Sequence, residues 1–228
     1  MSRFWPVVLR EGPLVLRPLE RSDARAYAET RAHNARWLTP WEATNPDPRY
    51  RLPPFGELRR HLNAQAKRGQ VLPFALEIDG RFRGQLTVSS FQWGSVMSAT
   101  LGYWIDERVA GHGHMPTAVA LATDHLVHTL GLHRVEVNIR PENTPSLRVV
   151  EKLGFRDEGL RARYMHIDGD WRDHRTFALT AEDIPHGLLP MWLHVRDAGP
   201  TIGGTRATDP GTAGPDTGRM HTDPDDSR

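Results

Sequence analysis

The chain contains no cysteine and very little lysine. The absence of cysteine among its 228 residues excludes disulfides, thiolate metal sites and a cysteine nucleophile. Lysine occurs only at Lys67 and Lys152, so arginine carries almost all of the positive charge. The formal net charge is only +1, and this balance gives no electrostatic reason to expect direct binding of nucleic acid.

Long apolar runs are also missing. No stretch approaches the roughly 20 apolar residues that a membrane-spanning helix needs, so no membrane contact is expected. The first twenty residues carry several charges, at Arg3, Arg10, Glu11, Arg17 and Glu20, which a secretory signal peptide would not tolerate in its apolar region. We therefore expect a soluble cytoplasmic protein.

Residues 199–228 have few bulky apolar side chains. Gly, Pro, Thr and Asp make up most of this segment, and Ile202 and Met220 are almost its only bulky apolar residues. Such a composition cannot bury enough surface to offset its ordering entropy. It predicts a disordered tail, with a partner-binding tail as the alternative. Residues 1–198 are long enough for one domain with a substantial core.

The remaining pattern mixes helices and strands. Asp79-Gly80 and Asp168-Gly169 are favoured hairpin turns, and residues 134–140 alternate between apolar and polar side chains as a half-buried strand does. Residues 37–54 are rich in Pro, Trp and Asn and indicate a loop. Helices are predicted at 22–34 (capped by Ser22), 55–67, 116–130 and 145–153, and strands at 14–17, 74–79, 82–91, 99–106, 134–140, 163–167 and 172–179. This order predicts an α+β (mixed α/β) fold, a mixed sheet with helices on both faces.

A glycine turn, Gly111-His112-Gly113, lies between a predicted strand and a predicted helix. Glycines let the backbone approach a ligand closely, and the unpaired amides at the start of a helix favour a phosphate group. Two known phosphate loops do not fit. A Walker loop needs Gly-Lys followed by Ser or Thr, and a dinucleotide fingerprint needs a third glycine where Pro116 stands.

The spacing Arg108-x-x-Gly111-x-Gly113 resembles the acyl-CoA loop of the GNAT acetyltransferases. Further motifs occur in the same order as in the RimJ/RimL branch, which acetylates the N-termini of ribosomal proteins. They are Leu14-x-Leu16-Arg17-Pro18-Leu19, Asn143-x-x-Ser146, Leu153-Gly154-Phe155 and Gly169-Asp170-Trp171-Arg172-Asp173-His174. The resemblance covers about residues 8–181.

This resemblance implies a GNAT fold and an acetyl-CoA-dependent N-acetyltransferase. The central sheet would be mixed but mostly antiparallel, with one splayed pair of parallel strands and the pantetheine arm in the gap near Ile105. Asn143 would contact that arm, unless it only caps its helix, and Ser146 would lie beside the sulfur. The cofactor-binding residues implied are Ile105, Arg108, Gly111, His112, Gly113, His114, Met115, Pro116, Thr117, Asn143 and Ser146.

Acetyl transfer needs a proton acceptor for the amine and a donor for the departing thiolate. Glu136 is the candidate base, acting directly or through water, or else it is a solvated or arginine-paired strand carboxylate. Ser146 is the candidate donor to the thiolate, or else a helix-capping serine. Relatives use a tyrosine on the short helix where this chain has Val149 or Val150. Tyr164 is therefore a second acid candidate, or a packing residue.

Only the pKa of the acceptor amine helps to narrow the choice of acceptor. A protein α-amine has a pKa of about 7.7–8.0 against about 10.4 for lysine, so a site with a weakly defined base suits an N-terminus. Trp37 and Trp41 could line a peptide groove or anchor their loop, and Asp173 and His174 could meet the substrate or pair structurally. The His112 and His114 rings lack further ligands for a metal, so none is expected.

Three functions remain open at this stage. They are acetylation of a protein N-terminus such as that of a ribosomal protein, acetylation of a small amine such as an antibiotic, polyamine or amino acid, and non-catalytic acyl-CoA binding. The sequence does not decide between a monomer and a homodimer.

Overall fold

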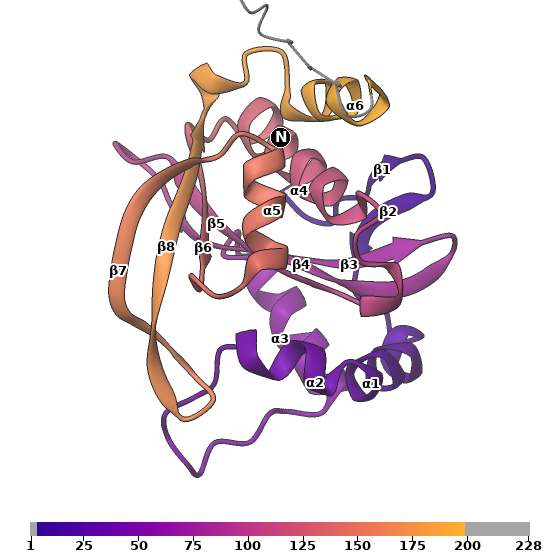
Figure 1. Ribbon diagram of the computed structural model, residues 1–228. Helices are drawn as coiled ribbons and strands as arrows, with labels where there is room; N and C mark the ends of the chain where they lie inside the picture. Colours follow the sequence, from indigo (N-terminus) through magenta and orange to yellow (C-terminus); the bar gives the residue numbers. More distant parts are fainter. Residues whose placement is uncertain (1–3, 199–228) are drawn as a thin grey trace, which may run out of the picture. The chain divides into compact units, whose positions relative to one another are not determined.

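The computed structural model describes residues 4–198, so the predicted tail at 199–228 lies outside the described residues. It contains one eight-stranded sheet of order β1-β2-β3-β4-β5-β6-β8-β7 (Figure 1). Every neighbouring pair is antiparallel except β5 and β6. The predicted mixed, mostly antiparallel sheet is therefore confirmed. The strands are β1 (Leu9–Glu11), β2 (Leu14–Pro18), β3 (Leu72–Ile78), β4 (Arg81–Gln92), β5 (Ser98–Ile105), β6 (Arg134–Ile139), β7 (Arg156–Ile167) and β8 (Asp170–Thr180).

Helices cover both faces of the sheet (Figure 1). Successive side chains of β3 point to opposite faces of the sheet. Phe74 lies in the main core beneath α4, and Ala75 lies in a smaller cluster with Tyr27 and Phe55. One face therefore carries α1 (Asp23–His33) and α3 (Phe55–Lys67). The other carries α4 (His114–Asp124), α5 (Thr144–Lys152) and α6 (Leu188–Ala198). Among the helices of residues 4–198, none combines the length and apolar character that crossing a bilayer requires.

Locally encoded elements match the prediction closely. Helix 55–67 has the predicted bounds, and Val135, Val137 and Ile139 are buried on one face of β6. Asp79 and Gly80 both have positive φ, at 50° and 70°, as a two-residue hairpin turn requires. Turn chemistry and side-chain period were thus sufficient to predict these elements.

Several predicted details are wrong. Ser22 does not cap α1, because its hydroxyl donates to Glu20 (3.2 Å). The Asp23 carboxylate instead accepts from the Glu20 amide (2.7 Å) and pairs with Arg17 (2.8 Å). The predicted loop at 37–54 begins with helical turns, α2 (Ala35–Leu38) and a 3₁₀ turn at Thr39–Trp41.

The ends of some elements also differ from the prediction. The helix after the glycine loop starts at His114 rather than Pro116, and its last turn, His125–Thr129, is π-helical. The short β1, the first half of β7 and the whole of α6 were not predicted. These segments lack a clean periodic pattern, and their position depends on packing against distant parts of the chain.

The parallel pair is joined along only part of its length. β5 and β6 pair from Ser98↔Arg134 to Leu101↔Val137, and the rest of β5 has no partner on that side among residues 4–198. Gly102–Ile105 therefore presents backbone groups to an opening in the sheet, as the predicted splay requires.

Candidate active site

A cavity of about 830 Å³ lies at the splayed end of β5. It is lined by residues from helices on both faces of the sheet, including Tyr27 and Leu62 on one face and Met115 and Val149 on the other. Gly102 has no side chain to close the opening between them. The cavity therefore runs through the sheet from one helical layer to the other.

The glycine loop forms one wall of this cavity. Gly111 and Gly113 both line it and have φ of 83° and 81°, a left-handed conformation that other residues adopt only with strain. Gly113 is also the N-cap of α4. Within residues 4–198, the amides of residues 111–113 donate to no protein acceptor. They are thus free to donate to a ligand, and phosphate binding at this loop stays a prediction.

The start of this loop is held by the buried Asp106. Its carboxylate accepts from Arg108 (2.7 Å), Arg83 (2.9 Å) and Asn34 (3.1 Å). Burial alone would raise the pKa of Asp106, but the hydrogen bonds from Arg108, Asn34 and Arg83 outweigh it and hold that pKa well below its usual range. Asn34 also accepts from the Glu107 amide (2.8 Å). The guanidinium of Arg108, a predicted cofactor-binding residue, is therefore engaged in anchoring the loop.

The far end of the loop is supported by α6. The Trp192 indole donates to the Thr117 hydroxyl (2.8 Å), which donates to the Gly113 carbonyl (2.9 Å). Asp124 accepts from the first amides of α6, those of Leu188 (2.6 Å) and Leu189 (3.0 Å). Thr117, predicted to contact the cofactor, is buried and holds the loop backbone in place from behind.

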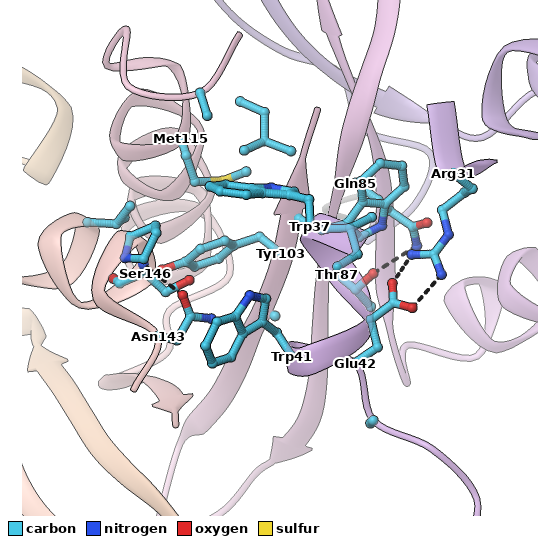
Figure 2. Close-up of a pocket in the computed structure, with 18 of the residues that line it drawn as sticks. Arg31, Trp37, Trp41, Glu42, Gln85, Thr87, Tyr103, Met115, Asn143 and Ser146 are labelled. Atoms are coloured by element: carbon cyan, nitrogen blue, oxygen red, sulfur yellow. Dashed lines mark hydrogen bonds and ion pairs between the residues drawn. The ribbon is translucent and has the colours of Figure 1, made fainter. Parts of the chain in front are cut away.

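The start of α5 forms another part of the wall (Figure 2). The Asn143 side chain accepts from the Ser146 amide (3.2 Å) and so caps α5, while both residues line the cavity. The Ser146 hydroxyl has no hydrogen-bond partner in the described part of the chain, so it can act on a ligand. The predicted positions of Asn143 and Ser146 beside the cavity agree with this geometry.

Tyr103 is a cavity residue that the sequence reasoning missed. Its hydroxyl lies 3.5 Å from the Ser146 carbonyl oxygen, beside the start of α5 (Figure 2). Burial raises the pKa of Tyr103, so the phenol stays protonated and keeps a proton to donate. The alternation of Leu101, Tyr103 and Ile105 along β5 was a usable signal, since it places Tyr103 toward the layer that carries α5.

The other end of the cavity is aromatic. Trp37 and Trp41 line it, as predicted for substrate residues (Figure 2). Glu42 forms a bidentate ion pair with Arg31, whose guanidinium lies 5.3 Å from the Trp104 ring centroid. The Gln85 amide donates to the Thr87 hydroxyl (3.0 Å). This end therefore offers apolar surface and polar groups that are already paired.

Two catalytic candidates lie away from the cavity lining. Glu136 sits where β5 and β6 are still paired, and it accepts from Arg134 (2.8 Å) and Arg161 (3.5 Å). The Tyr164 ring centroid lies 5.0 Å from the Arg161 guanidinium carbon and 5.6 Å from the centroid of the His174 ring, which is steeply inclined to it. The structure thus places both residues in the alternative settings named above, and their catalytic roles stay predictions.

Four further candidates are also outside the lining. Asp173 accepts from the Arg163 amide (2.7 Å), and His174 is buried with its pKa lowered by that burial. His112 and His114 lie side by side, with ring centroids 6.2 Å apart. Burial, and secondarily the neighbouring His112, lowers the pKa of His114. No cluster of three metal-ligating side chains occurs among residues 4–198.

Comparisons with known proteins agree with this geometry. The family described as "Acetyltransferase (GNAT) domain" matches residues 13–156. The ribosomal protein uS5-alanine N-acetyltransferase of Escherichia coli is 33% identical over 173 residues, which is 75% of this chain and 89% of that protein. The probable N-acetyltransferase YjcK of Bacillus subtilis is 29% identical over 180 residues, 77% of this chain and 98% of that one.

A solved structure extends the comparison to the bound cofactor. Mycobacterium smegmatis RimJ in complex with CoA-disulfide superposes with a TM-score of 0.79 at 37% identity, covering 85% of this chain and 97% of that one. The predicted GNAT fold and family are therefore confirmed. The chain belongs to the GNAT acetyltransferases, in the branch of the RimJ- and RimL-like ribosomal-protein N-acetyltransferases, and is an acetyl-CoA-dependent N-acetyltransferase.

Proposed function

We propose that this enzyme transfers acetyl from acetyl-CoA to the N-terminal α-amine of a protein, with a ribosomal protein carrying an N-terminal alanine as the model acceptor. The observation that carries the proposal is the lack of a free carboxylate at the cavity. Within the described residues, Glu42 is the only acidic residue in the lining, and Arg31 holds both of its oxygens.

A cavity without a free carboxylate favours an acceptor that is already partly neutral. At pH 7 roughly a tenth of protein α-amines are uncharged, but well under a thousandth of lysine side chains are, given pKa values of about 7.7–8.0 and 10.4. An α-amine therefore needs little help from a base before it attacks. A lysine or polyamine acceptor needs a strong one.

The hydroxyl groups near α5 are suited to the departure of the thiolate, which follows attack by the amine. Attack on the thioester forms the amide bond and breaks the carbon–sulfur bond, so the sulfur must be stabilised or protonated as it leaves. Ser146 and Tyr103 both carry hydroxyl protons at this wall. The side of the Gly102–Ile105 backbone that faces β6 is unpaired and supplies amide donors for the carbonyl oxygen.

The charge of the lining argues against a small polycationic acceptor. Glu42 is the only acidic residue among the described residues of the lining, and Arg31 pairs with it. A polyamine would therefore find no unpaired carboxylate for its additional ammonium groups. The protein N-terminus, with one charge and an apolar first side chain, fits the aromatic end better.

A panel of acceptors tests the proposal. We expect incorporation of labelled acetyl into peptides with a free N-terminal alanine. The same peptides with a blocked N-terminus and one internal lysine are the matched control and should remain unlabelled, as should spermidine. Labelling of spermidine or of the blocked peptides in preference to the free ones would refute the proposed acceptor class.

A further inference from the structure

Helix α5 presents two cationic side chains to the cavity. Arg148 and Lys152 are four residues apart, which places them on one face of the helix, and both line the same cavity as Gly111 and Gly113. Neither side chain forms an ion pair within residues 4–198. Lys152 is also one of only two lysines in the chain.

The other arginines around this cavity are already engaged. Arg31 is bound to Glu42, and Arg108 is bound to Asp106. Arg196, on α6 behind Gly113, pairs with Asp197 (2.8 Å). The two cations of α5 are thus the charges that the lining leaves for a ligand.

Coenzyme A carries two separate phosphate groups, and the site offers two different kinds of phosphate donor. The glycine loop supplies neutral amides at a helix start, which suit the diphosphate. The ribose 3′-phosphate is a monoester with close to two negative charges at neutral pH. In a water-exposed position, such a group is bound better by charged side chains than by neutral amides. An arginine guanidinium can donate two parallel hydrogen bonds to it, and a lysine ammonium adds a compact positive charge.

We propose that Arg148 and Lys152 bind the 3′-phosphate of coenzyme A and make the enzyme discriminate against 3′-dephospho-CoA. This inference rests on the proposed function only in that acetyl-CoA occupies this cavity. The loop then binds the part that both coenzymes share, and α5 recognises the group that distinguishes them.

Calorimetric titration of the full chain with CoA and with 3′-dephospho-CoA tests the inference. We expect wild type to bind CoA about 10- to 100-fold more tightly, the range expected for one or two charge-assisted contacts near solvent. In the double variant Arg148→Gln/Lys152→Gln this ratio should fall to about one, while the affinity for 3′-dephospho-CoA stays unchanged. Both side chains are exposed, so the variants should fold, and an unchanged melting temperature verifies this.

Arg196→Gln is the matched control, since it removes one positive charge next to the loop but on another helix. It should preserve the discrimination ratio. The inference is overturned if wild type binds both coenzymes equally, if the double variant keeps the wild-type ratio, or if Arg196→Gln alone abolishes it. Failure to bind either coenzyme would instead overturn the proposed function, so the two failures are distinguishable.

Discussion

Replacing Gly111 by alanine should separate the contribution of the glycine loop to stability from its contribution to ligand binding. Gly111 has φ of 83° and Gly131, at the far end of the same helical segment, has φ of 74°. An added β-carbon meets no atom within 4 Å at either position. Alanine in the left-handed region costs about 1–2 kcal/mol, and each kcal/mol lowers the melting temperature of a domain of this size by about 2–4 °C. Gly111→Ala and Gly131→Ala should therefore both melt about 2–8 °C below wild type.

The two variants should differ in their affinity for coenzyme A. Gly111 lines the cavity whereas Gly131 does not, so only the first methyl group displaces a bound phosphate from the loop amides. Loss of one hydrogen bond to a charged group costs about 1.5–3 kcal/mol, which is roughly a 10- to 150-fold loss of affinity. Thermal unfolding by circular dichroism and titration calorimetry give the two quantities. Equal affinity losses for both variants, or none for Gly111→Ala, would refute the reasoning.

Three further perturbations follow from the contacts of the site. Asp106→Ala leaves the half-buried Arg83 without its carboxylate and should lower the free energy of unfolding by about 2–4 kcal/mol. Because the folded pKa of Asp106 is depressed, this difference in stability should be constant above about pH 5 and shrink as the pH falls further. A difference that grows toward low pH in urea titrations would contradict this expectation. Trp192→Phe removes the hydrogen bond to Thr117 and should cost about 1 kcal/mol with weaker coenzyme binding, and unchanged binding would show that α6 does not support the loop. Tyr103→Phe should lower kcat about 100-fold with little change in the KM for acetyl-CoA; an unaltered kcat would remove its role as a donor.

Local sequence signals identified the elements that position the site. The Asp79-Gly80 turn, the alternation along β6 and the glycines after β5 each depend on a few neighbouring residues, so their structure was predictable. The loop motif and the Asn143-x-x-Ser146 pattern likewise singled out residues that line the cavity.

The features that the sequence did not reveal depend on contacts between distant segments. Glu136 is on the polar face of β6, as expected, but the strand pair opens only beyond Val137, and one sequence gives no register for that opening. Tyr103 approaches Ser146 across 43 positions, and Trp192 reaches Thr117 across 75. Periodicity carries no information about such pairs.

The extension of the cavity through the sheet has a consequence for the order in which the substrates bind. Donor and acceptor can enter from opposite faces, so neither has to leave before the other arrives. We therefore expect acetyl to pass directly from donor to acceptor within a ternary complex. Initial rates measured at several fixed acceptor concentrations should accordingly give intersecting rather than parallel double-reciprocal lines.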